Sequence, residues 1–324
     1  MESNLRPLTL GEILDRTAQL YRNNFLLFAG IYAVYAGVVM VLGLLQIGAT
    51  ELLRVQHVGQ PEQWAALGAV IVLLPLIFVF AGAAMAAINR AVSRVYLCES
   101  ATIRSAYSTI LPRLGRYLWL MTIVGFIIWA PFVVIFGGYF AGLFYLHAFS
   151  TNGAATDPQA AVGVIVLSLV FFLLAIAWGV YAIFMGLRYS LVVPACVVED
   201  LKARKAIRRS IELSKGSRGR IFLLGLLIVV LQIGLVLLAQ LFFFIFAFKS
   251  HGVLPVWVQV LQQIVSFFTN SFIGPMYAIA LALFYYDQRI RKEGFDIEWM
   301  MQAAGLTVPA PVAEMPSSTP ETQA

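Results

Sequence analysis

Charged residues are scarce in this sequence, and six long stretches contain none at all. Asp, Glu, Lys and Arg make up 12% of the chain, whereas soluble domains have about 25%. Each uncharged stretch is longer than the roughly 20 residues that a helix needs to cross a bilayer. The composition therefore excludes a soluble globular protein. The six stretches are Phe25–Ala49, Ala65–Ile88, Tyr117–Phe149, Ala161–Leu187, Ile221–Phe248 and Gln259–Tyr286.

The stretches also lack the polar and apolar alternation of barrel strands, so that helices are the expected spanning form. We predict an all-α fold, a polytopic membrane helix bundle with six transmembrane helices. The membrane domain should cover residues 1–305. Residues 306–324 are rich in Pro, Ala, Ser and Thr, and this composition predicts a disordered cytoplasmic tail.

Lys and Arg are almost absent from every second gap between the stretches. Of the 22 Lys and Arg residues, 20 lie in the alternate gaps that include both chain ends. Basic residues beside spans stay in the cytoplasm, which predicts that both termini and the loops 89–116 and 188–220 are cytoplasmic. The net charge of +6 then faces anionic lipid headgroups, and no nucleic-acid partner is expected.

A short amphipathic segment precedes the first, third and fifth stretches. The segments Thr9–Asn24, Thr102–Arg116 and Ala203–Arg220 predict surface helices, and one such helix plus two spans could form a unit used three times. Thr9 and Glu12 have the spacing of a capping box. The apolar side of the first helix would lie against acyl chains or pack on the bundle's own cytoplasmic end.

The third of these segments is the most basic. It carries Arg204, Lys205, Arg208 and Arg209, and Asp200 is a candidate N-cap. This cluster predicts contact with anionic lipid headgroups or with a protein partner at the cytoplasmic face. The alternative is that the basic residues only orient the neighbouring spans.

The third stretch would be about 50 Å long as a straight helix, which exceeds a hydrocarbon core of about 30 Å. The helix is therefore expected to bend, tilt or project, and Pro131 and the pair Gly137 and Gly138 predict a break. The remainder up to Phe149 is too short for another crossing, so that we expect it to project or re-enter at the outer face.

The polar side chains inside the last two stretches are amides and hydroxyls. They predict hydrogen bonds between two helices or, alternatively, a polar seam that lines a transport cavity. Pro275 after Gly274 marks a place where the sixth helix could open. The seam residues are Gln232 and Gln240 in the fifth stretch and Gln259, Gln262, Ser266 and Asn270 in the sixth.

Metal-ligating and nucleophilic residues are few. His57, His147 and His251 all map to the outer side without a paired helical spacing, and Cys98 and Cys196 give no disulfide framework. We therefore predict no metal, no cofactor and no catalytic residue. If the protein were an enzyme of the membrane surface, the three histidines would be its candidate metal ligands or general bases.

Three segments resemble a known family: RPLTLGEILDRTAQLYRNNF near the start, residues 188–222, and residues 278–300 with YYDQRIRKEGFD. They are similar to the glycerophosphoryl diester phosphodiesterase membrane-domain family of bacterial multi-pass proteins. The resemblance implies a location in the bacterial cytoplasmic membrane. In that family the membrane region precedes a phosphodiesterase barrel in some members and stands alone, without an established role, in many.

The residues after Gly305 are far fewer than the roughly 250 that a barrel needs, so that no hydrolase activity is expected. We predict a non-catalytic module that binds lipids or a partner protein. The alternative is a transporter or lipid-handling protein that uses the polar seam.

Overall fold

The computed structural model describes residues 6–55, 61–97, 99–149, 158–249 and 255–294, together with 297 and 301. Within these ranges all regular structure is helical, which confirms the predicted fold class; the predicted tail at 306–324 lies outside them. The long helices are α2 (Phe25–Val55), α3 (Pro61–Tyr96), α5 (Leu114–Phe149), α6 (Pro158–Tyr189), α9 (Arg218–Lys249), α10 (Val256–Ile273) and α11 (Pro275–Glu293). The short elements are α1 (Leu10–Asn23), α4 (Ile103–Ile110), η1 (Leu111–Arg113), α7 (Val192–Val198) and α8 (Ala203–Ser214).

Six segments of the described chain are long and apolar enough to cross a membrane. Each overlaps one predicted stretch, and α10 and α11 together form the sixth. The protein is therefore a multi-pass membrane protein, as predicted. The segments are Phe25–Leu52, Leu76–Tyr96, Ile103–Leu146, Ala161–Val198, Arg218–Ala247 and Val256–Glu293.

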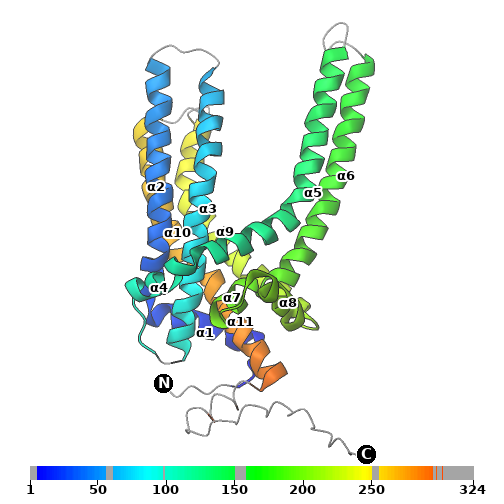
Figure 1. The fold of residues 1–324 in the computed structure, drawn as a ribbon. Coiled ribbons are helices and arrows are strands. Elements are labelled where there is room, and N and C mark those ends of the chain that lie inside the picture. Colours follow the sequence, from blue (N-terminus) through cyan, green and yellow to red (C-terminus); the bar gives the residue numbers. More distant parts are fainter. Residues whose placement is uncertain are drawn as a thin grey trace, which may run out of the picture.

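The spanning helices form two arms that share one end (Figure 1). In the first arm, α2 packs against α3 and α10, and α10 packs against α9. In the second arm, α5 and α6 pair with each other and diverge from the first arm. Helices α1, α4, α7, α8 and α11 lie at the end where the arms meet, which we call the basic end.

Helix α5 bends along its length but does not end (Figure 1). The predicted bend is therefore confirmed, whereas the predicted break at Pro131 or at Gly137 and Gly138 is wrong. The helix continues through all three residues, so that no separate projection begins within the last described part of α5. A bend lets a helix that is too long for the hydrocarbon core remain within it.

The neighbouring helix supplies the hydrogen bonds that the bend requires. Pro131 lies inside α5 and has no N–H, which leaves the carbonyl of Ile127, four residues earlier, without its helical donor. The hydroxyl of Tyr181 donates to this carbonyl at 2.9 Å, and the indole N–H of Trp178 donates to the carbonyl of Ile128 at 2.9 Å. In hydrocarbon, such side chains have to replace water.

The sixth segment divides at Gly274, the place where the sequence predicted that it could open. Pro275 begins α11, and a Cβ at position 274 would collide with the ring of Tyr32. The hydroxyl of Tyr21 donates to the carbonyl of Phe272 beside the division. Burial raises the pKa of Tyr21 to about 12, so that this hydroxyl keeps its proton.

The amphipathic helices pack their apolar sides on the protein itself. Thr9 and Glu12 form the predicted capping box at the start of α1, and the hydrogen bond from the Thr9 backbone lowers the pKa of Glu12. Ile13 of α1 is fully buried, and α1 packs against α11. Helices α1, α4 and α8 each precede two spanning segments, since α10 and α11 form one segment together, so that the order of elements agrees with the predicted threefold unit.

Three details of the predicted surface helices are wrong. The third helix does not extend over Ala203–Arg220, because α8 ends at Ser214 and Arg218 already begins α9. The second does not extend over Thr102–Arg116, because Pro112 lies in the 3-10 turn η1 that follows α4. Asp200 does not cap α8, which begins without a side-chain cap. Asp200 instead has a positive φ of 53° and contacts Arg113 at 2.6 Å and Arg116 at 2.7 Å, which links its loop to the start of α5.

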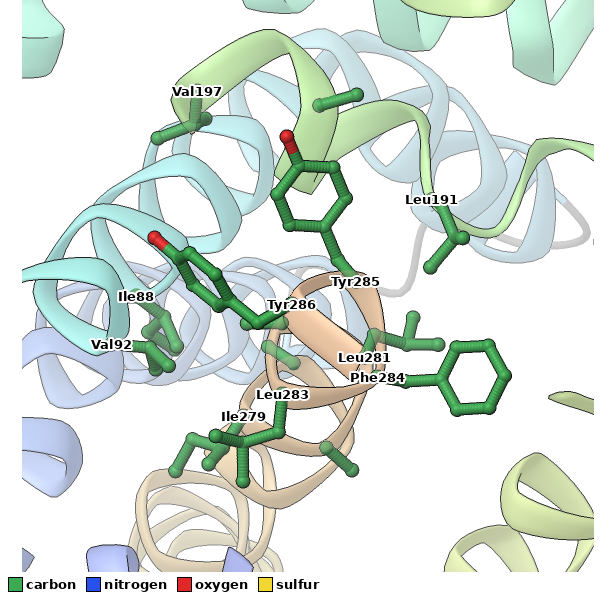
Figure 2. Close-up of a cluster of buried hydrophobic side chains, with 14 of the residues drawn as sticks. Ile88, Val92, Leu191, Val197, Ile279, Leu281, Leu283, Phe284, Tyr285 and Tyr286 are labelled. Atoms are coloured by element: carbon green, nitrogen blue, oxygen red, sulfur yellow. The ribbon is translucent and has the colours of Figure 1, made fainter. Parts of the chain in front are cut away.

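The buried core lies at the basic end and is centred on α11 (Figure 2). From Ala278 to Tyr286 the residues of α11 are buried on every side. Figure 2 shows the ring of Tyr286 directed toward Ile88 and Val92 of α3, while Tyr285 points toward α7. A helix that is apolar all round belongs inside a protein, and α11 is the helix around which the others pack.

The hydrogen bonds at Pro131 predict that two substitutions are coupled. Tyr181→Phe removes the donor to Ile127, and we expect the free energy of unfolding to fall by about 1 kcal/mol. In a Pro131→Ala background the new amide can bond that carbonyl, so that the same change should cost clearly less. Thermal unfolding in detergent measures both effects. Equal losses in the two backgrounds would show that the hydroxyl does not compensate for the proline.

Candidate functional site

Charged and tyrosine side chains at the end of α11 reach into the neighbouring elements at the basic end. They follow the apolar part of α11 directly, so that the helix carries them from the core to its rim. Ion pairs and hydrogen bonds join them to side chains before α8, on α8 and on α9. We call this group the α11 charge cluster: Glu199, Arg209, Arg220, Tyr285, Asp287, Arg289, Arg291, Lys292 and Glu293.

Asp287 is the most deeply buried member, and its side chain has 0% exposure. Arg291 Nε donates to both carboxylate oxygens at 3.0 Å, and Arg220 Nη1 lies 3.3 Å from Oδ2. The backbone N–H of Leu8 donates to the same carboxylate at 2.8 Å. Arg291 and Arg220 also donate to the Leu8 carbonyl, at 2.6 and 2.9 Å. The N-terminal segment is thereby fixed against α9 and α11.

A second part of the cluster joins α7 and α8 to α11. Arg209 contacts Glu199 at 3.0 Å and Glu293 at 2.5 Å. Arg289 lies 3.2 Å from Glu293, and the hydroxyl of Tyr285 donates to Glu199 at 2.5 Å. Burial alone would lower the pKa of Arg209, but hydrogen bonds to Glu293 and Glu199 outweigh it and raise that pKa. The Arg209 guanidinium therefore stays charged.

Lys292 closes the far end of α8. Its amine donates to the backbone carbonyls of Glu212 at 2.9 Å, Leu213 at 2.9 Å and Lys215 at 2.7 Å. The last carbonyls of a helix have no partner within the helix, and they carry the negative end of its dipole. The Lys292 amine therefore supplies partners to these carbonyls and offsets the negative end of the dipole of α8.

The predicted lipid-contact residues of α8 divide into two kinds. Arg204 and Lys205 are exposed and form no ion pair within the described part of the chain. Arg208 is exposed and lies 3.2 Å from Glu212, whereas Arg209 turns inward to the α11 charge cluster. Arg204 and Lys205 are therefore the basic groups of α8 that remain available to a ligand.

The structure brings most of the predicted polar seam together between α9 and α10. The Gln240 amide donates to the Ser266 hydroxyl at 3.0 Å, and the Gln262 amide lies 3.5 Å from Gln240 Oε1. Gln232 donates to the carbonyl of Ile273 at 3.0 Å, next to the division of the sixth segment. These contacts link the two helices at three places.

Asn270 lies apart from these pairs. It is exposed, and its amide donates to a backbone carbonyl of its own helix, that of Ser266, at 2.8 Å. The other seam groups described above donate to or accept from a partner across the helix interface. This use of their hydrogen-bonding capacity favours packing over a ligand cavity.

The predicted metal-ligand candidates are mostly beyond what the structure describes. His57, His251 and Cys98 lie outside the described residues, and so does the side chain of His147. Cys196 is buried, and its thiol donates to a backbone carbonyl at 3.2 Å. Among the residues that are described, no group of three or more His, Cys, Asp or Glu could hold a metal.

The α11 charge cluster was not predicted from the sequence. Hydropathy places Asp287 just beyond an apolar stretch, where a charged side chain ordinarily reaches water. A signal was nevertheless present, because the pairs Asp287 with Arg291 and Arg289 with Glu293 have the i,i+4 spacing of helical ion pairs. Such spacing predicts the pairs within the helix but not their partners elsewhere.

No protein-family model, curated protein or solved structure matches this chain. The six apolar segments define its class, a multi-pass membrane protein. The α11 charge cluster and the exposed basic groups of α8 are the features from which a function has to be argued.

Asp287 should be critical for stability. Asp287→Asn leaves Arg220 and Arg291 without their buried countercharge, and we expect the free energy of unfolding to fall by about 3 kcal/mol. Asp200→Asn is the matched control, since that side chain is 49% exposed and should contribute less than about 1 kcal/mol. Denaturant unfolding in mixed micelles compares the two. Similar small losses would contradict the role assigned to Asp287.

The hydrogen bond between Gln240 and Ser266 predicts a small loss of stability in the single variant and little further loss in the double variant. Gln240→Leu should lower the free energy of unfolding by about 0.6 kcal/mol, the average for hydrogen bonds between membrane helices. Adding Ser266→Ala should cost little more, because it removes the hydroxyl that Gln240→Leu has already left without its donor. The same unfolding measurement applies. Fully additive losses would show that the two side chains do not act as a pair.

Proposed function

We propose that this protein is a non-catalytic membrane module that binds anionic lipid headgroups at its basic end. Helices α1, α4, α7, α8 and α11 form that end. The proposal places it at the cytoplasmic face, with both chain termini on the same side. The family resemblance adds the bacterial cytoplasmic membrane as the proposed location.

The proposal rests on a difference at the basic end: the acidic side chains are paired inside the protein, whereas some basic side chains are not. The carboxylates of Glu199, Asp287 and Glu293 are all engaged in ion pairs inside the protein. Arg204 and Lys205 stay exposed without an acidic partner among the described residues. The outer face of α8 therefore keeps a positive charge, and each basic residue near an anionic membrane contributes about 1 kcal/mol of attraction.

Sequence and fold both support this orientation. The basic end unites the segments that contain 20 of the 22 Lys and Arg residues, and such residues are retained in the cytoplasm. An even number of crossings returns the chain to the side on which it started. Arg204→Cys should accordingly react with a membrane-impermeant thiol reagent only after the cells are permeabilised.

The alternative function, transport through the polar seam, is the weaker one. Gln232, Gln240, Gln262 and Ser266 serve as helix contacts, which leaves Asn270 as the exposed polar group of the seam. Substrate flux in proteoliposomes that disappears on substitution of Asn270 by Leu, with folding intact, would favour transport over lipid binding.

Charge substitutions on α8 test the proposed function. Arg204→Gln together with Lys205→Gln should lower the preference for phosphatidylglycerol over phosphatidylcholine by up to about thirtyfold, because the loss of about 1 kcal/mol per residue sums to about 2 kcal/mol. Glu212→Gln is the control of opposite sign, because it releases Arg208 and should raise the preference. Spin-labelled lipids measure the preference as the fraction immobilised by the protein.

The preference should also weaken as salt rises, since exposed charges are screened within about 10 Å at 0.1 M. If the double variant and Glu212→Gln both behave like the wild type, the basic face of α8 does not select anionic lipid. A stoichiometric acidic protein bound to the same face would replace the lipid as its ligand.

A further inference from the structure

Among the described residues, four arginines have a buried Nε without a hydrogen-bond partner: Arg90 and Arg94 on α3, and Arg188 and Arg218 at the base of α6 and α9. The last two lie together at the base of the arms. Arg188 lies in the last turn of α6, and Arg218 begins α9. In each side chain Nε is buried and has no hydrogen-bond partner. The Arg188 guanidinium lies 5.9 Å from the ring centroid of Tyr189, a cation–π contact that does not neutralise its charge.

The two arginines lie at one junction. The hydroxyls of Ser210 and Ser214 on α8 donate to the backbone carbonyl of Arg188, at 3.0 and 3.4 Å. Arg218 follows Ser214 by one short turn, and α6 packs against α9 directly. The end of α6 and the start of α9 are therefore held side by side by α8.

The described acidic residues near this junction are engaged elsewhere. Glu212 lies 3.2 Å from Arg208, and Asp287 contacts Arg220 and Arg291. Neither Arg188 nor Arg218 forms an ion pair within the described chain. The junction consequently has unbalanced positive charge, and partly buried guanidinium groups favour a phosphate, whose oxygens can accept from their N–H groups.

Apolar side chains continue from the same junction along both arms. On α6, Ile183 is 52% and Phe184 is 60% exposed, and on α9, Phe222 is 43% and Leu226 is 45% exposed. Both arginines also stand at the ends of apolar stretches, which is the depth of the headgroup region. Figure 1 shows α6 and α9 separating from this point into different arms. A positively charged junction with apolar surface next to it fits a ligand that has an anionic headgroup and apolar chains.

We propose that an anionic phospholipid binds where α6 meets α9, with its phosphate on Arg188 and Arg218 and its acyl chains along the exposed faces of the two helices. This site rests on the proposed function, since it names one place at which an anionic lipid binds. It differs from the outer face of α8, where contacts are exposed and screened by salt. The lipid would fill space between two helices that otherwise touch only near their ends.

Native mass spectrometry of the whole protein in detergent tests the site. The wild type should retain phosphatidylglycerol at concentrations at which phosphatidylcholine is lost. Arg188→Gln together with Arg218→Gln should bind phosphatidylglycerol at least tenfold more weakly. Arg204→Gln together with Lys205→Gln is the matched control with the same loss of charge, and it should retain the tightly bound lipid.

A second measurement uses the unaltered protein, in case the variant does not fold. Phosphatidylglycerol with a photoactivatable acyl chain should label the last turns of α6 and the first turns of α9. Labelling spread evenly over all the spanning helices would overturn the site. If glycerol phosphate prevents the labelling as effectively as unlabelled phosphatidylglycerol does, the acyl chains do not contribute to binding, and that part of the proposal is wrong.

The outcomes separate this site from the proposed function. If only the α8 variant alters the selection of anionic lipid, the basic face of α8 binds lipid and the site between α6 and α9 is wrong. If neither variant alters it, both are wrong. Loss of the tightly bound lipid in the Arg188 and Arg218 variant alone supports the site. It refutes the role given to α8 only if the Arg204 and Lys205 variant also keeps the wild-type preference for spin-labelled phosphatidylglycerol.

Discussion

A carboxylate that water cannot reach has to be surrounded by donors from the protein, and Asp287 imposes this requirement on the whole basic end. Its donors come from α9, from α11 and from the backbone ahead of α1. Three distant parts of the chain meet because one charge needs all of them. Glu199 and Glu293 extend the arrangement to α7 and α8 through Arg209. Polar contacts thus define how the elements around the core are joined.

The two arms are held together differently from the basic end, because most of their surface is apolar. There the backbone itself needs partners, and side chains provide them where a proline interrupts a helix. Tyr181 does so at the bend of α5, and Tyr21 and Gln232 do so where the sixth segment divides. Between such points α5, α6 and α9 leave large apolar side chains exposed, which suits contact with acyl chains. The large cluster of buried apolar side chains lies at the basic end.

The spans, the capping box at Thr9 and the order of short and long helices could be predicted from the sequence, because each depends on neighbouring residues or on a long apolar run. The length of α5 predicted a bend, but the continuation of the helix past Pro131 could not be predicted, since the donor that serves the free carbonyl lies 54 residues away. The α11 charge cluster was missed for the same reason. The burial of Asp287 depends on Leu8, which is 279 residues away, and hydropathy along the chain carries no information about that encounter.

The attachment of Leu8 to α11 has a consequence for biosynthesis. Leu8 is synthesised before all the described helices, whereas Asp287 and Arg291, which hold its backbone, belong to α11 and follow ten other described α-helices. The segment around Leu8 therefore remains undocked while the spans that precede α11 are inserted one after another. Docking of this segment is a late step of folding that requires α11 to be in place.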